Sequence, residues 1–231
     1  MSEQTLIVFG ARQGLGLALV QLACAANWKV HAVVRPGAEH AALAATGCAI
    51  HFADALSAEA VNACFRGRTR LAWVVSTLSD TQGMADAAGN IHVIQAAVRS
   101  KAKGVLLVSS LGAGDSRAHA SDRLLAAIGH VLSAKTLAEE ALRNSGLPFC
   151  ILRPGGLVDG PPRGTAQLLR AADAHGFIRR SDLALMMFRL LEEGRLLDQT
   201  RTAIDPSCPP PTRYAASSQA PEAHPAKAIP T

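Results

Sequence analysis

TLIVFGARQGLGLALV, residues 5–20, is the stretch of sequence that decides the fold. Its apolar run at 6–9 is too short for a helix and rich in β-formers, which favours a buried parallel strand. Gly10 ends that strand, and Gly14 and Gly16 lead into an apolar helical pattern. Glycines allow a tight turn and a close approach to a pyrophosphate, and the N–H groups at the helix start attract an anion. The stretch predicts a strand, a dinucleotide phosphate loop and a helix, with ordinary turn glycines as the weaker interpretation.

The end of the second predicted strand, at 29–34, indicates which dinucleotide is bound. NAD sites usually place an Asp or Glu there to hold the ribose 2′-hydroxyl. Arg35 stands at this position, and a guanidinium can pair with a 2′-phosphate through two charge-assisted hydrogen bonds. Arg12, inside the glycine loop, is placed to reach the same phosphate from the other side. We therefore expect NADP(H), with solvated surface charge as the alternative role of both arginines.

Length and composition indicate one α/β domain. The chain has 231 residues, of which 49% are hydrophobic and 18% charged, and this suits buried parallel strands covered by helices. The formal charge is +5, but Lys and Arg are scattered and aromatic residues are scarce, which favours anionic small ligands over nucleic acid. No signal-peptide pattern and no apolar run of membrane-spanning length is found in the sequence. We expect a cytoplasmic protein without a membrane partner.

The cysteines and histidines do not suggest a disulfide framework or a metal site. The five cysteines, at 24, 48, 64, 150 and 208, are odd in number, widely spaced and free of any CxxC pair. Four lie in predicted helices or strands, where we expect buried thiols, and Cys208 lies in the tail. No histidine pair has metal-ligand spacing. The sequence therefore predicts no bound metal.

The whole chain shows βαβ alternation. Six strand-like runs occur at 5–9, 29–34, 48–52, 71–75, 104–109 and 147–152. Helical patterns lie between them at 15–26, 38–46, 57–66, 84–102 and 121–145. This alternation predicts a single doubly wound parallel sheet, the Rossmann fold.

The C-terminal part is predicted to contain a short helical cap and a tail. We expect two helices at 165–174 and 181–194, the second with Ser181 as its N-cap. The domain then occupies residues 1–205. Residues 206–231 are rich in proline, alanine and serine, which predicts a disordered or loosely attached tail.

Several motifs, in this order, resemble those of the atypical short-chain dehydrogenase/reductase superfamily. Beside the glycine loop they are VVSTLS at 74–79, VLLVSSLGAG at 105–114, SAKTLAEEALRNSGLPF at 133–149, ILRPGGLVDGP at 151–161 and FIRRSDLALMMFRLL at 177–191. Within the superfamily, the chain is similar to the small NAD(P)H-binding proteins related to biliverdin IXβ reductase/flavin reductase and to NmrA-like proteins. The resemblance covers about the first 205 residues and implies a cofactor bound across the carboxyl edge of the sheet.

The resemblance also implies roles for individual residues around the cofactor. It assigns the three loop glycines to the pyrophosphate and Arg35 to the 2′-phosphate. Asp54 would lie near the adenine, and Ser76 and Thr77 near the ribose and nicotinamide. Backbone groups around the nicotinamide would come from Arg153, Pro154 and Gly155. Asp54 also suits a helix cap together with Ser57, and Ser76 and Thr77 suit polar capping at a strand end.

The catalytic motif of the superfamily is incomplete in this chain. The main branch uses a serine and a Tyr-x-x-x-Lys pair, in which the lysine lowers the tyrosine pKa for proton transfer. Ser110 and Lys135 match the serine and the lysine, and the lysine would also hold the cofactor. Val131 stands four residues before Lys135, and the single tyrosine, Tyr214, lies in the predicted tail. The usual acid is therefore missing, and we expect Val131 to face the pocket.

Three functions follow from this pattern. The first is an NADP(H)-dependent reductase of a small conjugated or carbonyl acceptor, with the proton from solvent, from Ser109 or Ser110, or from His130, which is more simply a surface residue. The second is an NADP(H) sensor without turnover. The third is an epimerase or dehydratase, although those enzymes generally retain the tyrosine. We expect a small-molecule substrate between loops 110–120 and 153–180, and a monomer or homodimer.

Overall fold

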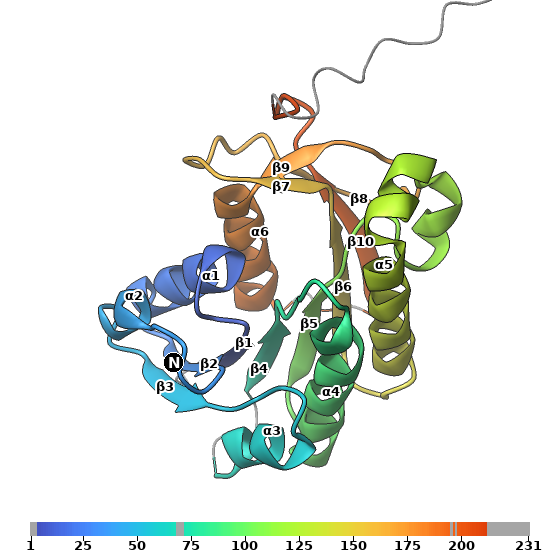
Figure 1. Cartoon of the computed structure of the whole chain (residues 1–231). Helices are drawn as coiled ribbons and strands as arrows, with labels where there is room; N and C mark the ends of the chain where they lie inside the picture. Colours follow the sequence, from blue (N-terminus) through green and yellow to red (C-terminus); the bar gives the residue numbers. More distant parts are fainter. Residues whose placement is uncertain (1–3, 68–71, 195, 197, 212–231) are drawn as a thin grey trace, which may run out of the picture.

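The computed structural model describes residues 4–67, 72–194, 196 and 198–211, and its core is an eight-stranded sheet with helices on both faces (Figure 1). Across the sheet the strands are β3 (Ala49–Phe52), β2 (Lys29–Val34), β1 (Thr5–Phe9), β4 (Trp73–Ser76), β5 (Gly104–Val108), β6 (Phe149–Pro154), β10 (Gln199–Ile204) and β8 (Gln167–Leu169). All neighbours are parallel except β10 and β8. The predicted doubly wound Rossmann fold is confirmed.

The helices lie in two groups, one on each face of the sheet (Figure 1). They are α1 (Gly14–Ala25), α2 (Ala41–Ala44), α3 (Ala58–Phe65), the π-helix η1 (Ala85–Gly89), α4 (Asn90–Arg99), the 3-10 helix η2 (Gly114–His119), α5 (Asp122–Arg143) and α6 (Arg180–Glu192). Side chains alternate along a strand, so Leu6 of β1 packs with Leu19 and Met187 under α1 and α6. Ile7 packs with Leu142 on the opposite face. Two apolar cores therefore enclose the sheet.

The C-terminal region differs from the sequence prediction. The predicted helix at 165–174 is wrong, because this segment forms β8, whose Leu168 pairs with Ala203 of β10. A second, two-stranded parallel sheet, also missed, joins β7 (Gly156–Val158) to β9 (Phe177–Arg179). Both depend on pairing with distant segments, which local periodicity does not report.

Several predicted helix boundaries also need correction. Only 41–44 of the predicted helix at 38–46 is helical, and the predicted helix at 84–102 opens with the π-helical turn η1. The N-cap of α6 is Arg179, not Ser181. The Ser181 hydroxyl donates instead to the carbonyl oxygen of Gly160, at 2.7 Å.

The segment that follows β10 is attached to the domain. The buried Asp205 carboxylate accepts a hydrogen bond from Arg179 Nη1 at 3.0 Å and another from the Ser207 hydroxyl at 2.7 Å. Cys208, which the sequence placed in the tail, is consequently only 8% exposed. Residues 212–231, with Tyr214, lie outside the described part of the chain.

No disulfide links the cysteines of the described residues, and these residues show no metal-binding group. Cys64 and Cys150 are buried, whereas Cys24 and Cys48 are half-buried, so the expectation of buried thiols holds for two of the four. Burial raises the pKa of the Cys150 thiol to about 12. Among the described residues, no three His, Cys, Asp or Glu side chains gather as metal ligands, and no helix there is long and apolar enough to cross a membrane.

Candidate functional site

The glycine loop between β1 and α1 is packed too tightly for side chains. Gly10 has φ +79°, and a Cβ there would lie 2.6 Å from Thr77 Oγ1. A Cβ on Gly16 would lie 2.8 Å from the same atom and would overlap the Gly10 carbonyl oxygen. The Thr77 hydroxyl lies within 3.1 Å of the carbonyl oxygens of Phe9 and Gly10. Thr77, at the end of β4, therefore supports the loop from behind.

The N-terminus of α1 is open to an anion. Its N-cap, Gln13, makes no side-chain cap hydrogen bond, and its first turn holds no acidic residue. By contrast, Ser57 caps α3 and Ser121 caps α5, each by accepting a backbone N–H. The first N–H groups of a helix need partners, and the positive end of the helix dipole favours a negative one. The tight glycine loop and the open helix start fit the pyrophosphate of a dinucleotide.

The residues expected around the adenosine lie at the same edge of the sheet. Arg35 directly follows β2, and Arg12 belongs to the glycine loop; both are exposed. Within the described residues, no carboxylate pairs with either guanidinium. Asp54 is also exposed, and its carboxylate accepts the Leu56 N–H at 2.9 Å. The cap of α3 is therefore Ser57 alone, and Asp54 orders the turn before it.

The Ser76 hydroxyl is turned into the protein. Ser76 is 1% exposed and donates to Asn90 Oδ1 at 2.5 Å. The Asn90 amide in turn donates to the carbonyl oxygen of Asp86, at 2.9 Å. These bonds join the end of β4 to the start of α4. The side chains of Ser76 and Thr77 thus both hold the edge of the sheet together from within the protein.

Lys135 lies beside an acid that the sequence did not indicate. Its ammonium is 2.6 Å from Asp86 Oδ1, and the two side chains are 10% and 0% exposed. The other oxygen of Asp86 accepts the backbone N–H of Asp80, at 2.9 Å. Asp86 belongs to η1, and π-helical turns are frequent at functional sites. The sequence signal that could have indicated Asp86 is an acid inside an alanine-rich helical pattern, ADAAG at 85–89.

Val131 and His130 of α5 both lie near the turn before η1, but one is buried and the other exposed. Val131 is 7% exposed. A Cβ on Gly83 would approach its Cα to 3.5 Å, so the turn before η1 packs against the helix there. His130 is exposed, and its Nε2 is 2.9 Å from the Thr81 carbonyl oxygen, to which it donates. Val131 is buried, and it does not line the cavity described below.

Arg153 forms the centre of a buried ion network. Its side chain is 2% exposed, and its Nε and Nη2 donate to the two carboxylate oxygens of Glu139, at 2.9 and 2.6 Å. Its Nη1 donates to Asp115 of η2. The Ser109 hydroxyl also donates to Glu139, at 2.6 Å. The guanidinium of Arg153 thus joins β6, α5 and η2, so this side chain is engaged within the protein.

Asp115 depends on this network. The hydrogen bond from Arg153 lowers the pKa of the Asp115 carboxyl, against the smaller opposing effect of burial. The neighbouring Gly114 has φ +54°, and a Cβ there would overlap the Arg153 guanidinium. The 110–120 loop is therefore held by a buried charge. Sequence reasoning missed Glu139 because nothing in LAEEALR distinguishes it from the exposed Glu140.

The remaining predicted residues lie where β5 and β6 end. Ser110 is half-buried, and its hydroxyl donates to the Leu111 carbonyl oxygen at 2.9 Å. Pro154 is buried as the last residue of β6. The Gly155 N–H donates to Ala203 at 3.0 Å, and a Cβ on Gly155 would overlap the carbonyl oxygen of Gly176. Because Gly155 has no side chain, the backbone at this position can approach the backbone of Gly176 closely.

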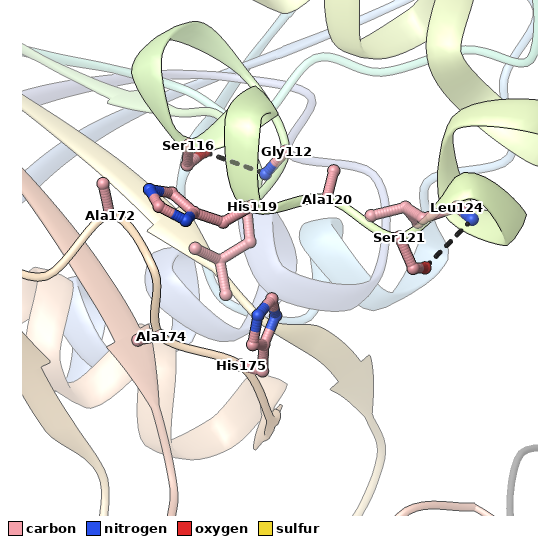
Figure 2. Close-up of a pocket in the computed structure, with 10 residues that line it drawn as sticks. Gly112, Ser116, His119, Ala120, Ser121, Leu124, Ala172, Ala174 and His175 are labelled. Carbon is pink, nitrogen blue, oxygen red and sulfur yellow. Dashed lines mark hydrogen bonds between the residues drawn. The ribbon is translucent and has the colours of Figure 1, made fainter. Parts of the chain in front are cut away.

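A cavity of about 320 Å³ lies between the two loops that the sequence predicted at the substrate (Figure 2). Two segments of the chain line this cavity. The first contributes Leu111, Gly112, Ser116, His119, Ala120, Ser121 and Leu124, and the second contributes Ala172, Ala174 and His175. The imidazoles of His119 and His175 approach it from opposite loops (Figure 2). His175 was missed because no motif surrounds it.

Similar proteins include two named reductases and one named epimerase. Residues 10–194 match a family model described as NAD(P)H-binding. The solved structure of ChuY, an anaerobillin reductase from Escherichia coli O157:H7, is 35% identical, covers 90% of this chain and 100% of its own, and superposes with a TM-score of 0.84. The uncharacterized sugar epimerase YhfK of Bacillus subtilis (strain 168) is 30% identical over 192 residues, 80% of this chain and 87% of that protein. Sanguinarine reductase of Eschscholzia californica is 35% identical over 112 residues, 45% of this chain and 39% of that protein.

Proposed function

The chain belongs to the NAD(P)H-binding family, and from that premise we propose that it is an NADP(H)-dependent reductase of a small conjugated or carbonyl acceptor. The observation that carries the proposal is the glycine loop, packed against Thr77 and leading into the uncapped start of α1. Gly10, Gly14 and Gly16 bind the pyrophosphate there. Bound NADPH supplies a hydride at the carboxyl edge of the sheet.

The preference for NADP(H) rests on the arginines next to this loop. Arg35 occupies the position where an NAD site carries an acid, and neither it nor Arg12 pairs with a carboxylate of the described residues. Both guanidinium groups are exposed and available to a phosphate. An acidic residue at position 35 would repel a 2′-phosphate, whereas an arginine pairs with it through two parallel hydrogen bonds.

The absence of the usual acid favours a conjugated acceptor. A conjugated system delocalises the incoming electron pair, so a strongly placed proton donor is not required. Two of the similar proteins are named as reductases, of anaerobillin and of sanguinarine, which supports this class of reaction. Lys135, held by Asp86, keeps a positive charge at the nicotinamide side, and Ser110 orients the acceptor.

We assign the acceptor to the cavity between the two loops. It is lined mainly by small and apolar residues, and His119 and His175 are the titratable groups on its wall. A neutral imidazole carries an N–H, and an imidazolium carries two, so each can donate a hydrogen bond or a proton to a polar acceptor group. Arg153 holds one side of the cavity through Asp115 of η2.

Turnover with NADPH tests this proposal. The protein is incubated with NADPH and a panel of bilins, flavins, quinones and aldehydes, and the loss of nicotinamide absorbance is followed. We expect oxidation with at least one conjugated acceptor and slower oxidation with NADH. Tight NADPH binding without turnover of any acceptor would contradict the reductase and favour the sensor.

An epimerase is the second candidate, because the Bacillus subtilis relative carries that name. Against it, Val131 stands where those enzymes generally keep a tyrosine. The two functions differ in net redox change, since an epimerase interconverts a nucleotide sugar without consuming NADPH. Chromatography of a nucleotide sugar incubated with the protein and NADP⁺ distinguishes them.

A further inference from the structure

The first turn of α6 holds the segment 159–164 at three points. Arg180 Nη1 pairs with Asp159 Oδ1 at 2.8 Å. The Ser181 hydroxyl donates to the Gly160 carbonyl oxygen at 2.7 Å. The buried Asp182 carboxylate accepts the backbone N–H groups of Arg163 and Gly164 at 2.8 to 3.1 Å. Three consecutive residues of one helix thus anchor a loop from the predicted substrate side.

Arg180 also lies against the glycine loop. A Cβ on Gly14 would be 3.5 Å from Arg180 Cδ and 3.6 Å from Arg180 Nε, which is ordinary van der Waals contact. Gly14 is the first residue of α1, and α1 packs directly against α6. The guanidinium of Arg180 therefore lies beside the uncapped helix start, where the dinucleotide pyrophosphate is expected. The side chain is 31% exposed, so a ligand can reach it.

We propose that Arg180 is a pyrophosphate-binding residue and that it exchanges Asp159 for the pyrophosphate when the dinucleotide binds. The inference rests on the proposed function, because it requires a dinucleotide at the glycine loop. The glycine loop offers backbone N–H groups, and Arg180 adds the full positive charge that Gln13 and the first turn of α1 lack.

The exchange is favourable on charge grounds. Asp159 is 87% exposed, and exposed ion pairs contribute little to stability because solvent screens them. A pyrophosphate carries more negative charge than one carboxylate and presents several oxygens to a guanidinium fork. Because Ser181 and Asp182 keep their own bonds to 160–164, the loop remains anchored while Asp159 is released. Dinucleotide binding thereby frees one end of the loop that leads toward the cavity.

Dissociation constants for NADPH and NADH, measured by calorimetric titration, test the proposal. Arg180→Gln is expected to weaken both dinucleotides equally, by about tenfold or more, as expected for the loss of a charge-assisted hydrogen bond. Asp159→Asn is expected to strengthen both, by up to about fivefold, because the competing carboxylate is gone. Arg180→Lys should recover part of the lost affinity.

Two variants at the other end of α6 serve as matched controls. Arg189→Gln and Glu192→Gln remove exposed charges from the same helix and should leave both dissociation constants unchanged. The proposed exchange would be overturned if Arg180→Gln bound both dinucleotides as tightly as the unmodified protein, or if it lost affinity for NADPH alone. Weaker dinucleotide binding by Asp159→Asn would also overturn it. Failure of the proposed function is distinguishable from these outcomes, since it appears in the unmodified protein, either as binding of neither dinucleotide or as NADPH binding without turnover of any acceptor.

Discussion

The ammonium of Lys135 lies 2.6 Å from the carboxylate of Asp86, and both side chains are almost completely buried. Replacing one member of a buried pair leaves an uncompensated charge, which typically costs about 3–5 kcal/mol. We therefore expect Asp86→Asn to lower the free energy of unfolding by an amount of this order, measured by urea denaturation. The double variant Asp86→Asn/Lys135→Met should lose less than Asp86→Asn alone. An unchanged unfolding free energy in Asp86→Asn would show that the pair does not exist in solution.

Gly16→Ala is expected to abolish dinucleotide binding and to destabilise the fold. The added Cβ would overlap the Gly10 carbonyl oxygen and lie 2.8 Å from Thr77 Oγ1, so the loop must shift. Gly129→Ala is the matched control, because its Cβ would meet nothing closer than 3.8 Å and alanine favours a helix by about 1 kcal/mol. The melting temperature and NADPH affinity are compared for both variants. Equal behaviour would contradict the tight packing of the loop.

Filling the cavity should weaken binding of the acceptor and leave binding of the cofactor unchanged. Ala174 lines the cavity of about 320 Å³, and Ala174→Phe places a ring in that space. We expect the KM for the acceptor to rise about tenfold or more, since roughly 1.4 kcal/mol of lost binding gives that factor. The dissociation constant for NADPH should stay the same. If KM is unaffected, the acceptor binds elsewhere.

Asp115 is expected to make the free energy of unfolding depend on pH in the acid range. Arg153 lowers its pKa in the folded state, so ionised Asp115 stabilises the fold above its unfolded-state pKa of about 3.9. This contribution is lost as the pH falls through the folded-state pKa. Asp115 is 74% exposed, so we expect at most about 1 kcal/mol. Unfolding free energies of the wild type and Asp115→Asn should differ at pH 6, and the difference should shrink as the pH falls below about 3.9 and through the lower folded-state pKa; a constant difference would contradict the assignment.

The parallel part of the fold was predictable because each strand carries its own signal. The runs that became β1, β4 and β5, at the centre of the sheet, are apolar almost throughout, as strands buried on both faces must be. β7, β8 and β9 have three residues each, too few to show a period. The segment AQLLRAADA at 166–174 has an apolar spacing that suits a helix, yet its position opposite β10 makes part of it a strand.

The cofactor loop was also predictable, because glycine spacing and the absence of side chains are local properties. The partners of the predicted residues were not. Glu139 and Asp86 look like surface acids on helices, and only the folded arrangement places them beside Arg153 and Lys135. The direction of the Ser76 hydroxyl, toward Asn90, likewise depends on how β4 meets α4. Local sequence therefore indicates the type of site, and tertiary packing decides which side chains face it.

Titration of the unmodified protein with NADPH and NADH is the most direct test of the NADP(H) assignment, and Arg35→Asp completes it. NADPH is expected to bind more tightly than NADH, and Arg35→Asp is expected to weaken NADPH by about tenfold or more while leaving NADH nearly unchanged. Equal affinity of the unmodified protein for the two dinucleotides, unaffected by Arg35→Asp, would contradict it.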